Sequence, residues 1–192
     1  MNRILAETKN PATHKKMKNA LKKIEATARS DHVDDGENKK TGERDGDCDY
    51  EPPEAFEDAL PFEDLTNCQK RVCFDFFEDF ARGKQSLSLV VGGAGTGKTQ
   101  CIKSIVSTLT RAGKIVGLCA TSGAAAVIIC GVTVHGCCGV KIDLDPKKAK
   151  PSRQAVMGTF DCIIVDEISL ATSPLMVCLD KCCRTAKGVD KP

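Results

Sequence analysis

The sequence of 192 residues has no tryptophan and one tyrosine, and aromatic side chains make up only 4% of it. Binding of bases by aromatic stacking is therefore not predicted by the composition. No apolar run approaches the roughly 18 residues of a membrane-spanning helix, and no secretory cleavage pattern follows the N-terminus. We expect an intracellular protein that does not enter a membrane. The basic N-terminus is rich in lysine and poor in arginine, which favours the nucleus over the mitochondrion.

Paired CxxC units with matching histidines are also missing, although the sequence has 12 cysteines. The cysteines occur singly or as neighbours, which disfavours a zinc site. Cys119 and Cys162 fall inside predicted strands, where a free thiol behaves as a small hydrophobic side chain. We interpret most of the cysteines as reduced and buried, as in a reducing compartment.

The net charge of +2 conceals a strong segregation of charge along the chain. Residues 1–30 carry eight basic and two acidic side chains, and residues 31–65 carry three and fourteen. Such segments bury too little apolar surface to offset chain entropy. We therefore expect a disordered charged tail over residues 1–56 and a folded domain over residues 57–192. The basic segment is interpreted as a solvated tail, a targeting signal or a nucleic-acid contact.

Regular patterns begin at Thr66 and Gln69, which have capping-box spacing and start a predicted helix that Gly83 ends. The apolar run 87–91 predicts a strand, and residues 98–109 a helix. Further along, residues 114–120 and 161–165 predict two buried strands and residues 124–130 a short helix. Ser173, as N-cap, starts the last predicted helix.

This alternation of strands and helices predicts an α/β fold with a parallel sheet and flanking helices. In such folds ligands bind at the carboxyl ends of the strands.

A glycine-rich stretch between the predicted strand 87–91 and the helix that follows matches the pattern GxxxxGK[ST]. Its residues are Gly92, Gly93, Ala94, Gly95, Thr96, Gly97, Lys98 and Thr99. Backbone N–H groups of such a P-loop surround phosphate oxygens at a helix start. Lys98 would neutralise the β and γ phosphates, and Thr99 would offer its hydroxyl to magnesium. The pattern predicts binding of ATP with Mg²⁺.

Two carboxylates, Asp166 and Glu167, directly follow the predicted strand that ends at Val165. Asp166 is placed to hold magnesium through its water shell, and Glu167 to orient and deprotonate the water that attacks the γ-phosphate. A solvated acidic loop is the alternative, and the P-loop upstream favours the catalytic interpretation.

Together these features resemble the superfamily-one DNA helicases of the petite-integration-frequency (PIF) type, which are related to the RecD helicases. The resemblance runs from about Leu65 to the end of the chain. It rests on LTNCQK around Gln69, GGAGTGKT, ATSGAAAVIICGVTVHG over residues 120–136, and IIVDEIS over residues 163–169.

The resemblance implies a RecA-like P-loop NTPase lobe that couples ATP hydrolysis to 5′-to-3′ DNA unwinding in repair, recombination or telomere maintenance. It assigns Gln69 to the adenine base, a role compatible with the structural one at the helix start. It also implies contacts with single-stranded or forked DNA from Thr121, Ser122, Gly123, Thr133 and His135. His135 alone would also fit an ordinary core or surface histidine.

A basic loop with Lys147, Lys148, Lys150 and Arg153 is suited either to nucleic-acid backbone contact or to solvation alone. Helicases that this chain resembles have a second RecA-like lobe that supplies catalytic arginines. We therefore expect this chain to hold only the first lobe, incomplete at its C-terminus, with weak ATP binding and little turnover. A nucleotide-dependent interaction module or an inactive remnant is the alternative; a small-molecule kinase is disfavoured because no arginine-rich lid follows.

Overall fold

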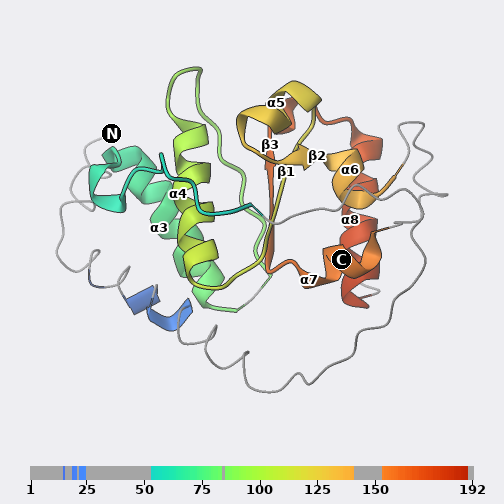
Figure 1. Ribbon diagram of the computed structural model, residues 1–192, viewed down its shortest axis with the longest axis horizontal. Coiled ribbons are helices and arrows are strands. Elements are labelled where there is room, and N and C mark those ends of the chain that lie inside the picture. The colour runs from blue at the N-terminus through green and yellow to red at the C-terminus, as the bar shows by residue number, and fades with distance from the viewer. Residues whose placement is uncertain are drawn as a thin grey trace. The chain divides into compact units, whose positions relative to one another are not determined.

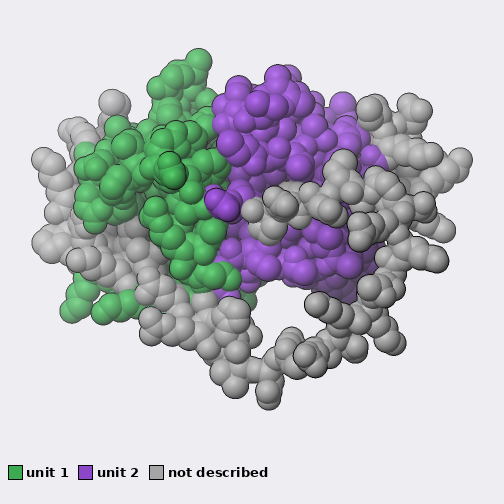
Figure 2. Space-filling view, in the orientation of Figure 1, with its two compact units in different colours: residues 1–43, 55–113 green, residues 44–54, 114–192 purple. Residues whose placement is uncertain are grey.

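The computed structural model describes residues 15, 19–20, 22–24, 53–83, 85–140 and 153–189. The chain divides into two compact units, coloured separately in Figure 2. The first unit comprises residues 1–43 and 55–113, and the second comprises residues 44–54 and 114–192. Most of the predicted tail lies outside the described residues. The few tail residues described between positions 15 and 24 are helical, and Ile24 is buried.

The regular elements of the first unit are all helices in its described part. The short η1 (Phe62–Asp64) leads into α3 (Asn67–Ala81), and α4 (Lys98–Arg111) packs against α3 (Figure 1). The predicted capping box is confirmed at Thr66, and the chain turns at Gly83 (φ 67°) as expected. Phe77 of α3 and Leu109 of α4 are buried, as the spacing of apolar residues predicts for two packed amphipathic helices.

Residues 56–58 brace α4 from a segment without regular structure. The Phe56 N–H donates to Ser107 Oγ at 2.8 Å, and Lys103 forms an ion pair with Asp58. The hydrogen bond from Lys103 lowers the pKa of the Asp58 carboxyl below its usual value. Local sequence patterns do not predict this brace, because its partners are separated by 45 to 51 residues.

The predicted strand at residues 87–91 was wrong. This apolar run belongs to no sheet, and the side chains of Leu87 and Val91 are 100% and 84% exposed. A strand needs a neighbour to satisfy its backbone N–H and C=O groups. The described part of the first unit has no strand that could pair with it. Apolar content therefore predicted an extended segment but not its pairing.

The second unit contains a three-stranded parallel sheet of order β2-β1-β3. Its strands are β1 (Val116–Ala120), β2 (Val132–Thr133) and β3 (Cys162–Asp166). The sequence predicted β1 and β3 with shifted ends and missed β2, which has only two residues. A parallel α/β fold, consistent with a partial RecA-like P-loop fold, is thereby confirmed.

Helices follow the strands of this unit (Figure 1). Their bounds are α5 (Gly123–Ile128), α6 (Val134–Cys138), α7 (Gln154–Thr159), η2 (Ile168–Leu170) and α8 (Ser173–Lys187). The short α6 and α7 were not predicted. The last helix was predicted correctly, although its N-cap is Thr172 rather than Ser173. None of the described helices has both the length and the apolar character needed to cross a membrane.

One pair of residues sets the start of the sheet. The Ile115 N–H donates to Asp161 Oδ2 at 2.7 Å, and the Asp161 N–H donates to the Ile115 carbonyl at 2.8 Å. Both residues directly precede their strands, so this reciprocal pair aligns β1 with β3. The alignment continues to the other end, where Ala120 pairs with Asp166.

The core of the second unit is rich in thiols. Cys119 of β1, Cys138 of α6 and Cys182 of α8 are fully buried in one apolar cluster with Met157 and Phe160. The cysteines of the described part are all free, and most are buried, in agreement with the small-hydrophobe interpretation. A hydrogen bond from the Cys138 thiol lowers the pKa of the Cys182 thiol below its usual value.

Candidate functional site

The glycine-rich loop ends in the first turn of α4. Gly95 (φ 73°) and Gly97 (φ 79°) both have left-handed backbones that favour glycine. A Cβ atom at position 97 would also collide with Gln69 Nε2. Residues 92–96 are exposed, and Gly97, the N-cap of α4, is half-buried. The loop therefore presents its backbone to solvent at the start of a 14-residue helix, as a phosphate cradle requires.

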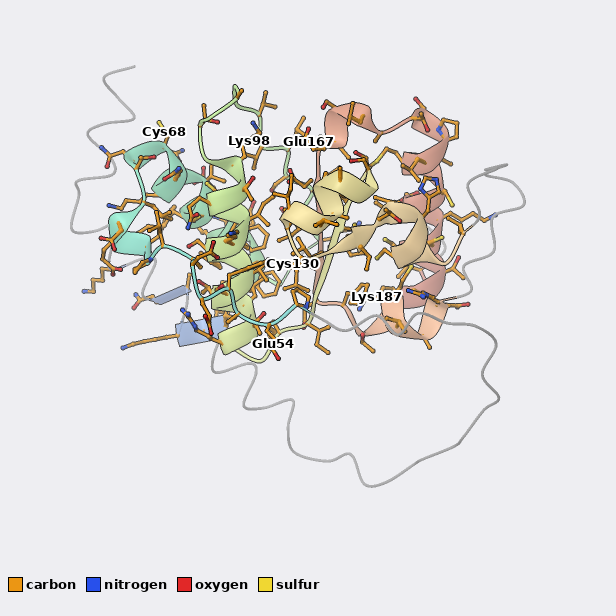
Figure 3. The ribbon with its side chains drawn as sticks, turned by 45° about the horizontal axis from the view of Figure 1, so that its top comes forward. Glu54, Cys68, Lys98, Cys130, Glu167 and Lys187 are labelled. Carbon is orange, nitrogen blue, oxygen red and sulfur yellow. The ribbon has the colours of Figure 1, made fainter. Side chains whose placement is uncertain are left out.

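Lys98 lies back across this loop (Figure 3). Its Nζ donates to the carbonyls of Gly92 at 2.8 Å and Gly93 at 3.0 Å. Thr96 Oγ1 donates to the same Gly93 carbonyl at 2.9 Å. An ammonium group has three N–H donors, so Lys98 is held over the loop by neutral acceptors that a phosphate oxygen could replace.

Gln69 connects α3 to the loop. Its Oε1 accepts a hydrogen bond from the Thr66 N–H at 2.9 Å, and its Nε2 donates to the Thr96 carbonyl at 3.2 Å. The structural role at the helix start is thus confirmed, and a second role in holding the loop is added. The sequence did not predict the second contact, because its partners are 27 residues apart. Contact with adenine stays a prediction.

The acidic pair lies at the carboxyl end of β3. Asp166 is the last residue of the strand rather than the first residue after it, and Glu167 follows. The Glu167 N–H donates to Asp166 Oδ1 at 2.9 Å. Glu167 is exposed (Figure 3), and Asp166 is half-buried. The two carboxylates thus lie at the carboxyl end of a strand, as predicted, at the edge where parallel α/β sheets generally bind ligands.

The other predicted contacts gather at the same edge of the second unit. Thr121 directly follows β1, and its Oγ1 donates to the Glu167 carbonyl at 2.9 Å. Ser122 is the N-cap of α5, accepting from the Ala125 N–H, and Gly123 is the first residue of that helix. Thr133 ends β2 and caps α6, in which His135 lies.

The predicted residues therefore form two groups. Gln69 and the loop 92–99 belong to the first unit, and Asp166, Glu167 and residues 121–135 belong to the second. Each group is internally connected by hydrogen bonds. Of the basic loop, Lys147, Lys148 and Lys150 lie outside the described residues, and Arg153 is the N-cap of α7. Within the described ranges no three His, Cys, Asp or Glu side chains form a metal-binding group.

Comparison with known proteins assigns both groups of residues to one family match. The PIF1-like helicase family matches residues 64–191, a segment that contains both groups of predicted residues. No solved structure matches the chain.

Curated relatives come from Trypanosoma brucei brucei (strain 927/4 GUTat10.1). The ATP-dependent DNA helicase PIF3 is 35% identical over 106 residues, which cover 55% of this chain and 13% of that protein. The helicase PIF1 is 30% identical over 105 residues (55% and 11%), and PIF4 is 33% identical over 106 residues (50% and 13%). The alignments thus span about an eighth of each relative.

The match to the family covers two thirds of the chain and includes the glycine-rich loop, the acidic pair and the segment between them. This chain belongs to the PIF1-like helicase family.

Proposed function

We propose that this chain binds Mg²⁺-ATP on the loop 92–99 and hydrolyses it as part of a DNA helicase. The observation that carries the proposal is the loop geometry at the start of α4, where Lys98 spans the carbonyls of Gly92 and Gly93. Its occurrence in a chain of this family supports ATP as the nucleotide, since the relatives are named ATP-dependent DNA helicases.

Phosphate binding would begin with an exchange of partners at Lys98. The ammonium group leaves the two loop carbonyls and donates to β- and γ-phosphate oxygens, where charge-assisted hydrogen bonds are stronger. The N–H groups of the loop and the N-terminal dipole of α4 stabilise the remaining negative charge. Gln69, held between Thr66 and Thr96, would lie beside the adenine base.

The sequence offers two side chains that are suitable ligands for magnesium. The Thr99 hydroxyl and the Asp166 carboxylate are oxygen ligands, which Mg²⁺ prefers, often through water. When bound, the ion neutralises the charge that develops on the transferring phosphoryl group. Glu167 would accept a proton from the attacking water, a general-base contribution of about 10²- to 10⁴-fold in rate.

Nucleic acid would bind at the carboxyl edge of the sheet in the second unit. We assign this contact to Thr121, Ser122, Gly123, Thr133 and His135. Ser122 and Thr133 are the strongest candidate donors, because their oxygens accept the cap bonds of α5 and α6 and each hydroxyl still has a proton. The substrate would be single-stranded or forked DNA unwound 5′ to 3′ in the nucleus, during repair, recombination or telomere maintenance.

The binding step is tested with Lys98→Ala and a matched control on the same helix, Lys103→Ala. Lys103 is also a cation of α4, but it pairs with Asp58. Fluorescence titration with an ATP analogue should show that Lys98→Ala lowers the affinity about 10- to 100-fold. This is the loss in affinity expected when a hydrogen bond to a charged group is removed. Lys103→Ala should stay within about twofold of the wild type. Equal affinities for all three proteins would overturn the proposal.

The catalytic step is tested with Glu167→Gln, which keeps the shape of the side chain and removes its basicity. Single-turnover hydrolysis should slow about 10²- to 10⁴-fold while ATP affinity is retained. An unchanged rate would remove Glu167 as the general base. Binding of ATP without any hydrolysis by the wild type would favour a nucleotide-dependent interaction module, in which ATP occupancy orders the chain.

A further inference from the structure

The backbone of Glu167 is in an unusual conformation. Its φ of 53° and ψ of 40° place it in the left-handed region, where the described part of the chain has only one other residue besides glycines, Cys130. For a residue with a Cβ atom this conformation is strained. It persists only where surrounding contacts hold it.

Hydrogen bonds supply these contacts on both sides of the residue. The Glu167 N–H donates to the side chain of Asp166, and the Glu167 carbonyl accepts from the Leu170 N–H at 3.0 Å. Both partners are close in sequence and belong to the same turn. The third bond, from Thr121 Oγ1 to the Glu167 carbonyl at 2.9 Å, comes from a residue 46 positions away.

Strand register explains why Thr121 reaches this carbonyl. Ala120 pairs with Asp166 in the parallel ladder between β1 and β3. Thr121 and Glu167 directly follow these two strands. The two segments of the chain therefore leave the sheet side by side. The hydroxyl thus ties the turn after β3 to the most buried strand of the unit, in which every residue is buried.

We propose that Thr121 is a positioning residue for Glu167: its hydroxyl holds the left-handed turn and so fixes the direction in which the carboxylate points. The φ and ψ angles of a residue determine the direction of its Cα–Cβ bond, and a catalytic carboxylate displaced by about 1 Å can lose about 10²-fold in rate. This inference rests on the proposed role of Glu167 as the base in ATP hydrolysis.

The assignment gives Thr121 a different task from that of its neighbours. A hydroxyl has one proton, and the proton of Thr121 is donated to Glu167. A phosphate oxygen could accept a hydrogen bond from this hydroxyl only if the hydroxyl stopped donating to the Glu167 carbonyl. Holding Glu167 and donating to a nucleic-acid phosphate are therefore alternatives at Thr121.

The test uses Thr121→Val, which has the same shape without the hydroxyl, and Thr121→Ser, which keeps the hydroxyl. In the 192-residue chain, the NMR carbonyl shift and the amide–α-proton coupling of Glu167 report its backbone conformation directly. Both should change in Thr121→Val and stay at wild-type values in Thr121→Ser. Signals of Glu167 that are unchanged in Thr121→Val would overturn the proposal, whatever the activity of the chain.

Kinetics supply the second readout. Single-turnover ATP hydrolysis should slow about 10- to 100-fold in Thr121→Val with the ATP dissociation constant within about twofold, and Thr121→Ser should restore the rate. Equal loss in both variants, or loss of ATP affinity alone, would contradict a positioning role. If Glu167→Gln hydrolyses ATP as fast as wild type, the proposed catalytic function fails, while the NMR comparison still decides the contact.

Discussion

The two units of this chain hold their functional residues by different means. In the first, Lys98 bonds to carbonyls five and six positions before it, and the loop leads into a helix start that its own glycines permit. In the second, Glu167 is held by Thr121 across 46 residues, through the pairing of β1 with β3. A local motif can fold wherever its sequence occurs, whereas a site at a sheet edge depends on the register of the whole sheet.

The units also differ in how far their apolar segments are buried. All five residues of β1 are buried, and Leu118 is fully buried. The equally apolar run 87–91 of the first unit is exposed, with Leu89 71% accessible. Composition is similar in the two segments, so pairing with neighbouring strands accounts for the difference.

The largest expected effect tests this contrast with one substitution in each segment. Leu118→Ala should lower the free energy of unfolding by about 2–5 kcal/mol, because it removes buried methyl groups and leaves a cavity. Leu89→Ala should change it by less than about 0.5 kcal/mol, as expected for an exposed side chain. Urea denaturation measures both, and a comparable loss in Leu89→Ala would show that the segment is buried in solution.

A smaller effect tests the local character of the glycine-rich loop. Gly97→Ala should destabilise the protein by about 1–3 kcal/mol, because alanine is strained at a φ of 79° and its methyl group meets Gln69. The control is Gly93→Ala, whose added Cβ would approach no closer than 4.0 Å to Thr96 Cγ2. Thermal unfolding should separate the two variants, and equal melting temperatures would contradict the loop geometry.

Helix caps give a third comparison between the units. Thr66 forms a complete capping box with Gln69 at the start of α3, whereas Thr172 at the start of α8 makes no side-chain cap bond. Thr66→Ala should cost about 1 kcal/mol of stability, and Thr172→Ala only a few tenths. The reverse order in urea denaturation would mean that α8 rather than α3 depends on its cap.

The last comparison is a dependence on alkaline pH in the second unit. Burial, with a contribution from the Asp161 carboxylate, raises the pKa of Cys162 to about 12. The unfolded thiol ionises near pH 8.5, so the contribution of this residue is complete below that pH and is lost as the pH rises toward 12.

Between pH 8.5 and pH 10 this loss amounts to about 1–2 kcal/mol. Cys162→Ala should therefore lose less stability than the wild type over that interval, measured by urea denaturation at each pH. Parallel curves for the two proteins would show that Cys162 ionises equally in both states.

Prediction from sequence succeeded where a pattern is complete within a few residues. The capping box at Thr66, the turn at Gly83 and the start of α4 at Lys98 all follow from local rules of helix formation. The strands β1 and β3 were predicted because each has enough consecutive apolar residues. The two-residue β2 and the helices α6 and α7 were missed because such short elements have too little periodicity.

By itself the sequence determined the candidate site residues and the family: a glycine-rich loop that matches the P-loop pattern, two carboxylates after an apolar strand and the membership of a helicase family. Only the tertiary structure decided which of the apolar runs pair, that Gln69 holds the loop through Thr96, and that Thr121 holds Glu167. The physical reason is the distance along the sequence between hydrogen-bond partners. Helix caps and glycine turns satisfy their hydrogen bonds within a few residues, whereas a strand and the turn after it depend on partners tens of residues away.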